Sequence, residues 1–258
     1  MFEHYGSLII TYGVATICWF LIYYKTRFGK YWTTTDAHTE PYSKPYWELL
    51  FAFLAVLAII AIGQLYINNL LIPNASNNNL VDALNQLLIF SPTFILLFIR
   101  KQSVNTIWLK PTFLLQRLSI GVVISILAMI LYHLVRKDAS PLHEFLLSVY
   151  HPSNISHLTQ VFLEDCTIAL LFYRLTYWIG DKWSIVIVAI LFALAHIPSL
   201  MANGASIQEL QNLLFDTMIG TIVFTALTKS KDIAWFIPLH FVMDMAQYHG
   251  GNQLHSLL

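Results

Sequence analysis

The chain has few charged residues for its length. Only 11% of its 258 residues carry charge, whereas about a quarter of the residues of a soluble domain do. Hydrophobic residues make up 57% of the chain. They gather in runs that approach or exceed the roughly 20 residues needed to cross a bilayer as a helix. This balance excludes an ordinary soluble domain and predicts an integral membrane protein.

Cysteines are scarce, and we expect neither a cleaved signal peptide nor a patch of basic residues. The two cysteines, Cys18 and Cys166, both fall within apolar runs, so we expect no disulfide framework. The first residues, MFEHYGSLII, lack the basic stretch that opens a cleaved signal peptide. The basic residues are scattered through short loops and form no single patch, which argues against a nucleic-acid partner.

The apolar runs predict an all-α polytopic membrane protein with about eight transmembrane helices. The loops between them are too short for a separate soluble domain. We therefore expect one membrane domain over residues 1–258, with four helices in residues 1–135 and a four-helix catalytic core in residues 157–249. The expected spans are 8–24, 48–68, 82–99, 117–135, 157–178, 183–199, 208–228 and 233–249.

The positions of the basic residues predict the orientation of these spans. If the N-terminus lies outside, all 14 Lys and Arg residues except Arg136 and Lys137 fall in inner loops or at inner helix ends. Inner loops of membrane proteins are enriched in Lys and Arg. We therefore expect the N- and C-termini to face outside.

Ionisable side chains within the predicted spans are candidate functional residues, because they are costly at membrane depth. Single examples often serve only to hydrogen-bond a neighbouring helix. Several such residues at one depth favour a functional site. The spans contain four acids and two histidines of this kind: Glu164, Asp165, Asp216, Asp244, His196 and His240.

Some of these side chains are expected at a common depth. At about 1.5 Å per residue, Glu164 lies roughly 10 Å from the outer end of its span. His196 and His240 lie roughly 10 to 20 Å from the inner ends of theirs, as does Asp244, so all are expected in the outer half of the membrane. His240 and Asp244 are four residues apart and share a helical face, where a carboxylate can accept a hydrogen bond from the imidazole.

Two of these stretches carry recognisable motifs, Phe192-Ala-Leu-Ala-His196 and His240-Phe-Val-Met-Asp244. In their order and spacing they resemble the CPBP intramembrane proteases. This family includes the type II CAAX prenyl endopeptidases and bacteriocin-processing or self-immunity proteins. Its pattern is Glu-Glu-x-x-x-Arg, then Phe-x-x-x-His, then His-x-x-x-Asn/Asp. The resemblance covers about residues 160–247.

The first motif departs from the family pattern. Glu164-Asp165 stands where the family has Glu-Glu, and Ala169 occupies the arginine position. Arg174 lies too far along the helix, about 80° off the Glu164 face, to replace that arginine. We expect Arg174 to extend toward the inner membrane surface with its charge in water.

The resemblance implies an intramembrane endopeptidase that cleaves a small hydrophobic or lipid-anchored peptide in a bacterial plasma membrane. By the same resemblance, Glu164 would activate the water and His196 would help to position it. His240 would face the oxyanion, oriented by Asp244. Asp165 and Phe192 are expected to support these groups. The expected partners are the hydrophobic or lipid-modified peptide and membrane lipids, with no cofactor.

Three alternatives remain at this stage. Ala169 and Asp165 favour a non-catalytic relative that acts as a bacteriocin-immunity or scaffold protein. His196 and His240 could instead be the two axial ligands of a haem. Glu164, His196 and His240 could together bind zinc, as two histidines and a carboxylate do in catalytic zinc sites, although the chain has no HExxH motif.

Overall fold

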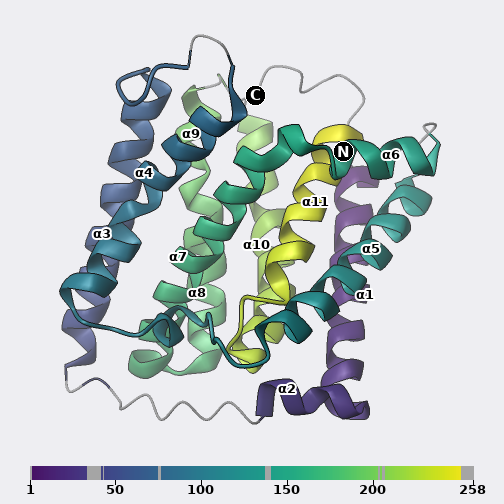
Figure 1. Ribbon diagram of the computed structural model, residues 1–258, viewed down its shortest axis with the longest axis horizontal. Helices are drawn as coiled ribbons and strands as arrows, with labels where there is room; N and C mark the ends of the chain where they lie inside the picture. Colours follow the sequence, from purple (N-terminus) through teal and green to yellow (C-terminus); the bar gives the residue numbers. More distant parts are fainter. Residues whose placement is uncertain are drawn as a thin grey trace. The chain divides into compact units, whose positions relative to one another are not determined.

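The computed structural model describes residues 2–33, 42, 44–74, 77–136, 141–202, 204 and 207–250, and these form helices and turns without a strand (Figure 1). The all-α polytopic membrane fold is therefore confirmed. The longer helices fall on the expected spans: α1 (Phe2–Lys25), α3 (Pro45–Ile67), α4 (Asn79–Ile99), α5 (Leu114–Arg136), α7 (Ile155–Ile179), α8 (Asp181–Ala195), α10 (Ile207–Ser230) and α11 (Phe236–Gly250). The shorter elements are η1 (Arg27–Gly29), α2 (Lys30–Thr33), η2 (Val104–Ile107), α6 (Leu142–Val149), η3 (Pro152–Asn154) and α9 (Ile197–Ala202).

The number of described helices that are long and apolar enough to cross a membrane is smaller than eight. Within the described residues, 6 helices are long and apolar enough to cross a membrane. Helices α8 and α11 have 15 residues each, and a helix of that length extends only about 22 Å. This is shorter than the hydrocarbon core of a typical bilayer, about 30 Å. The expected count of eight spans is not confirmed. The last residues of the C-terminal tail, 251–258, lie outside the described residues.

The expectation of one continuous helix over residues 183–199 is wrong. Helix α8 ends at Ala195, His196 lies in a turn, and α9 begins at Ile197. Pro198 gives the physical reason, because proline has no amide N–H and cannot donate the next bond of the helical ladder to Leu194. The break places the motif histidine at a helix end.

The described chain forms two compact units. We call the first the motif unit; it comprises Met1–Thr35, Thr112–Tyr150 and Ile185–Leu258. The second, the α7 unit, comprises Asp36–Pro111 and His151–Ser184. The expected grouping of four N-terminal and four C-terminal helices stays a prediction.

Helix α11 of the motif unit packs closely against α5 (Figure 1). A Cβ atom added at Gly121 of α5 would lie 2.8 Å from the Cα atom of Trp235, just before α11. Real Cβ atoms do not approach so near, so only glycine fits at this crossing. On the other side, the Trp19 ring of α1 stacks on the Trp235 indole with 5.2 Å between centroids. Residue Trp235, just before α11, is thus in contact with both α5 and α1.

A buried ion pair fixes the turn between α10 and α11. Asp232 in this turn pairs with Arg117 of α5, and both side chains are fully buried. The carboxylate of Asp232 also accepts hydrogen bonds from the indole N–H of Trp32 at 2.9 Å and the amide of Ala234 at 3.1 Å. A charged carboxylate without such partners would be costly to bury. The pair therefore links the turn to α5 and α2.

Helix α7 forms the core of its own unit, where it packs against α3 and α4 (Figure 1). Its residues from Asp165 to Leu175 are all buried. The hydroxyls of Thr93 on α4 and Thr167 on α7 are 2.8 Å apart, which joins the two helices by a hydrogen bond. The helix ends at Gly180, whose φ of 78° is unfavourable for any residue with a Cβ atom.

Candidate functional site

Helix α11 presents Phe236, His240 and Asp244 on one face, since residues four apart lie one turn from each other. The Nε2 atom of His240 is 3.6 Å from an Oδ2 atom of Asp244. This distance is longer than a hydrogen bond, and the two groups attract each other as charges when the imidazole is protonated. The Phe236 ring stacks on the His240 imidazole with 5.3 Å between centroids. His240 is buried and Asp244 is partly exposed, so the pair lies at the edge of the packed interior.

His196 caps the helix end created by the break after α8. Its backbone amide bonds to the carbonyl of Ala193 at 3.2 Å, one residue nearer than in a regular helix. The carbonyl of Phe192 consequently loses that amide as its partner, and the Nδ1 atom of His196 lies 2.8 Å from it. A carbonyl can only accept, so Nδ1 carries the proton and the Nε2 atom of a neutral His196 carries the lone pair. The imidazole is exposed.

Phe192 lies beside both imidazoles. Its ring meets that of His196 edge to face at 4.8 Å and that of His240 at 6.2 Å between centroids. It also contacts Phe224 of α10 at 6.0 Å. Aromatic rings therefore contact both histidines, since Phe192 lies beside each and Phe236 stacks on His240.

Asp216 of α10 is a member of this cluster that the motifs do not include. The half-buried carboxylate interacts electrostatically with His196 and Asp244. One turn further on, α10 approaches α8 closely, since a Cβ atom at Gly220 would lie 3.5 Å from that of Ala189. The sequence marked Asp216 only as an acid within an apolar helix and gave it no partner. The structure supplies those partners within the motif unit.

Glu164 and Asp165 lie on α7, in the other unit. Glu164 is partly exposed, whereas Asp165 is fully buried. Adjacent helical residues point about 100° apart, which accounts for this difference. Asp165 interacts electrostatically with the neighbouring Cys166. Ala169, at the family arginine position, is also fully buried.

Arg174 is not where the sequence placed it. We expected a side chain extended into water, but Arg174 is fully buried. Its guanidinium donates to the carbonyl of Leu170 at 2.9 Å, hydrogen-bonds to Gln102 and lies over the ring of Tyr42. The expectation was wrong because acceptors within the α7 unit bind two of the guanidinium nitrogens of Arg174.

The described residues of each unit contain no group of three His, Cys, Asp or Glu side chains arranged to hold a metal ion. The zinc alternative needs Glu164 of one unit with His196 and His240 of the other. It therefore stays a prediction, as does the haem alternative. The arrangement within the motif unit supplies two imidazoles and two carboxylates for proton transfer and hydrogen bonding.

Part of the chain matches a known family. Residues 158–246 match the family described as type II CAAX prenyl endopeptidase Rce1-like. The matched segment contains both motifs, Glu164 and Asp216, and covers less than half of the 258 residues. The resemblance to the CPBP intramembrane proteases is thus confirmed over this segment. No curated protein and no solved structure matches the chain.

Proposed function

We propose, from the Rce1-like match over residues 158–246, that this integral membrane protein is a CAAX-type intramembrane endopeptidase. The expected substrate is a small hydrophobic or lipid-modified peptide. The observation that best supports the proposal is that His196 and His240 both lie beside Phe192 in the matched segment, with Asp244 next to His240. Paired imidazoles with an adjacent carboxylate are suited to hydrolysis, because they can bind water and donate to an oxyanion.

In the proposed reaction, Glu164 is the general base. It takes a proton from a water molecule as the water oxygen bonds to the carbonyl carbon of the peptide, and the carbonyl oxygen becomes an oxyanion. The C–N bond then breaks, and the leaving nitrogen takes the proton back from Glu164. The products are a carboxylic acid and an amine; the acid then ionises and the amine takes up that proton, so the reaction consumes one water and needs no further reactant.

His196 is proposed to position the attacking water. Its Nδ1 proton is directed to the carbonyl of Phe192, so the Nε2 lone pair of the neutral ring can accept a hydrogen bond from that water. The bond to a main-chain carbonyl also fixes the plane of the imidazole. A fixed acceptor reduces the reorganisation needed when the substrate binds.

His240 is proposed to stabilise the oxyanion. A ring protonated on both nitrogens can direct one N–H to Asp244 and donate the other to the oxyanion. The Oδ2 atom of Asp244 lies 3.6 Å from Nε2, which is the nitrogen whose N–H would point to Asp244. Asp244 itself has no proton to donate when ionised, so it acts on the substrate through His240.

The departures from the first family motif favour the non-catalytic alternative. The family arginine is replaced by Ala169, which is fully buried, and Asp165 replaces the second glutamate. A relative that has lost its activity could still bind hydrophobic peptides and act as a bacteriocin-immunity or scaffold protein. This second candidate predicts binding without cleavage.

The distribution of basic residues supports an orientation with both termini outside, and the family resemblance suggests a bacterial plasma membrane. This orientation and the bacterial origin are part of the proposal.

The proposal is tested by incubating the purified protein, reconstituted in lipid vesicles, with prenylated and unprenylated peptides. The expected result is that mass spectrometry finds two peptide products whose masses sum to that of the substrate plus one water. Bound but uncleaved peptide would favour the non-catalytic alternative. Loss of cleavage with a zinc chelator, restored by added zinc, would favour the zinc mechanism. A Soret absorbance band in the purified protein would favour the haem alternative.

A further inference from the structure

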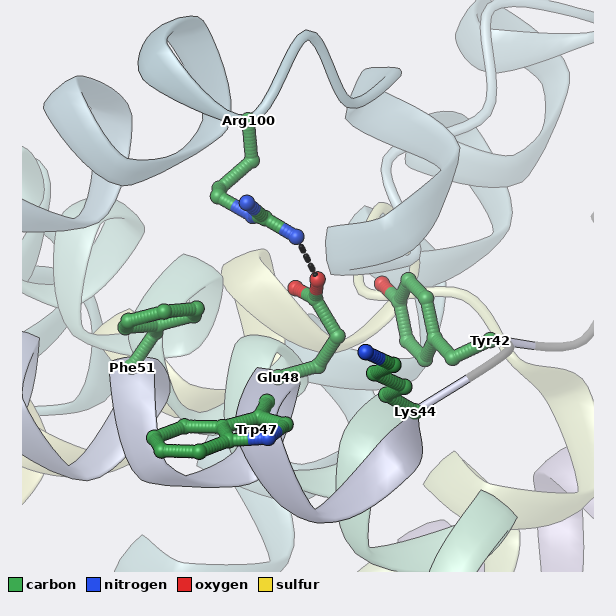
Figure 2. Close-up of a pocket in the computed structure, with 6 residues that line it drawn as sticks. All are labelled: Tyr42, Lys44, Trp47, Glu48, Phe51 and Arg100. Carbon is green, nitrogen blue, oxygen red and sulfur yellow. Dashed lines mark hydrogen bonds and ion pairs between the residues drawn. The ribbon is translucent and has the colours of Figure 1, made fainter.

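A pocket in the α7 unit takes no part in the proposed hydrolysis. It has a volume of about 300 Å³ and lies between the N-terminal end of α3 and the C-terminal end of α4 (Figure 2). Both charged and aromatic side chains form its wall. The lining residues are Tyr42, Lys44, Trp47, Glu48, Phe51 and Arg100.

The single acid of the pocket is already neutralised. Glu48 is buried, and one carboxylate oxygen forms an ion pair with Arg100 (Figure 2). The other oxygen accepts a hydrogen bond from Gln102 at 2.8 Å. The Arg100 guanidinium also lies over the ring of Phe51, 5.0 Å from its centroid. These contacts hold Arg100 in place, while 42% of its side chain remains exposed.

The remaining charge of the pocket is positive. Lys44 extends its ammonium group toward the Glu48–Arg100 pair (Figure 2). Arg174 does not line the pocket, but its guanidinium lies 5.7 Å from the centre of the ring of Tyr42, which does. Burial raises the pKa of Tyr42 to about 12, with Arg174 acting in the opposite direction. The phenol is therefore neutral at physiological pH. The two positive charges of Lys44 and Arg100 outnumber the single negative charge of Glu48. An anion fits such a site.

A lipid-facing stripe continues from the pocket along α3. Trp47 lines the pocket and is itself 45% exposed. Leu50, Leu54 and Leu57 follow it at intervals of three or four residues and are also exposed. Since α3 is long and apolar enough to cross the membrane, this stripe meets acyl chains. The ligand that fits both features has an anionic head and hydrocarbon tails.

We propose that this pocket binds the phosphate of an anionic phospholipid. Lys44 and Arg100 contact the phosphate, and the acyl chains lie along the Trp47–Leu57 stripe. The Glu48–Arg100 pair holds one of the two cations in place before the lipid arrives, which lowers the cost of ordering it on binding. The site is independent of the proposed hydrolysis, so its test needs no substrate peptide.

The test measures lipid selectivity by tryptophan fluorescence. The full chain is reconstituted in phosphatidylcholine vesicles that contain increasing fractions of brominated phosphatidylglycerol, which quenches nearby indoles. The contribution of Trp47 is obtained by subtracting the signal of a Trp47→Phe variant. Because a basic residue near a membrane surface contributes about 1 kcal/mol, Lys44→Gln should weaken the preference for phosphatidylglycerol about fivefold. The matched control is Lys101→Gln, which removes the same charge from an exposed residue beside Arg100.

A second variant tests the site without leaving a buried charge unpaired. Glu48→Gln combined with Arg100→Gln removes one charge of each sign, leaves the net charge of the pocket unchanged and should also weaken the preference. The proposal is supported if both changes weaken quenching at Trp47 and Lys101→Gln does not. Equal effects of Lys44→Gln and Lys101→Gln would overturn it, because they would indicate general surface charge. Displacement of the lipid by an equal concentration of inorganic phosphate would also overturn it, because the acyl chains would then contribute nothing.

Discussion

Replacing Asp232 by asparagine is expected to destabilise the motif unit strongly. The change keeps the shape of the side chain but removes the negative charge that faces Arg117. Both side chains are fully buried, so water cannot replace the lost partner. The guanidinium would retain its bond to the carbonyl of Thr112 at 2.9 Å, which does not neutralise it.

The size of the effect follows from this burial. Removing one partner of a buried ion pair costs about 3–5 kcal/mol. Hydrogen bonds to a charged group contribute about 1.5–3 kcal/mol each, and the bonds from Trp32 and Ala234 to Asp232 would weaken. At about 2–4 °C per kcal/mol, the thermal midpoint should fall by roughly 10 °C. The double variant Arg117→Met, Asp232→Asn buries no charge and should be more stable than either single variant.

The assay is a double-mutant cycle on the thermal unfolding of the purified protein in detergent, followed by tryptophan fluorescence. Trp32 and Trp235 lie beside the pair, so their emission reports on this region. The reasoning is refuted if Asp232→Asn costs less than about 1 kcal/mol, the level typical of exposed pairs. It is also refuted if the two single losses simply add in the double variant, because neighbours that interact do not behave additively.

Three other predictions concern the motif unit and the orientation of the chain. Phe192→Leu keeps an apolar contact against His196 and should lower cleavage by less than about tenfold, whereas His196→Ala should lower it by about 10²-fold or more. Equal losses at normal protein levels would contradict this division of roles. Asp216→Asn should lower kcat by about 5- to 30-fold with little change in KM, as expected for the loss of about 1–2 kcal/mol of electrostatic interaction. An unchanged kcat would show that Asp216 does not take part in the site. A cysteine introduced at Asn77 or Asn252 in a cysteine-free background should react with an impermeant thiol reagent in intact cells, and labelling only after permeabilisation would reverse the orientation.

Hydropathy was sufficient to predict most of the helices, because each apolar run must hydrogen-bond its backbone internally in a membrane. The boundaries of α4, α5 and α7 follow the expected spans within a few residues. The exception was the run through His196. Its apolar composition suggested a continuous helix, while the local effect of Pro198 ended α8 at Ala195. Hydropathy averaged over a window does not detect the missing amide donor of a single proline.

Spacing within one helix predicted which residues share a face, as for His240 and Asp244. Partners on different helices could not be predicted in this way. Asp216 was visible as an acid in an apolar helix, but its neighbours His196 and Asp244 depend on how α10 packs in the motif unit. Asp232 and Arg117 are buried together although their positions lay in expected loops or helix ends. Arg174 was misplaced because one of its acceptors, Gln102, lies on another segment.

The most direct test of the proposed function is the cleavage rate of Glu164→Gln. The substitution preserves the size of the side chain and removes the proposed base, so cleavage of a substrate peptide should fall by about 10²- to 10⁴-fold while the protein still inserts and folds. Asp165→Asn serves as the comparison and should cost less, about 10- to 100-fold, as expected for a supporting group. Cleavage that persists in Glu164→Gln would contradict the proposed mechanism. A cellular phenotype that survives the same substitution would favour the non-catalytic immunity or scaffold function.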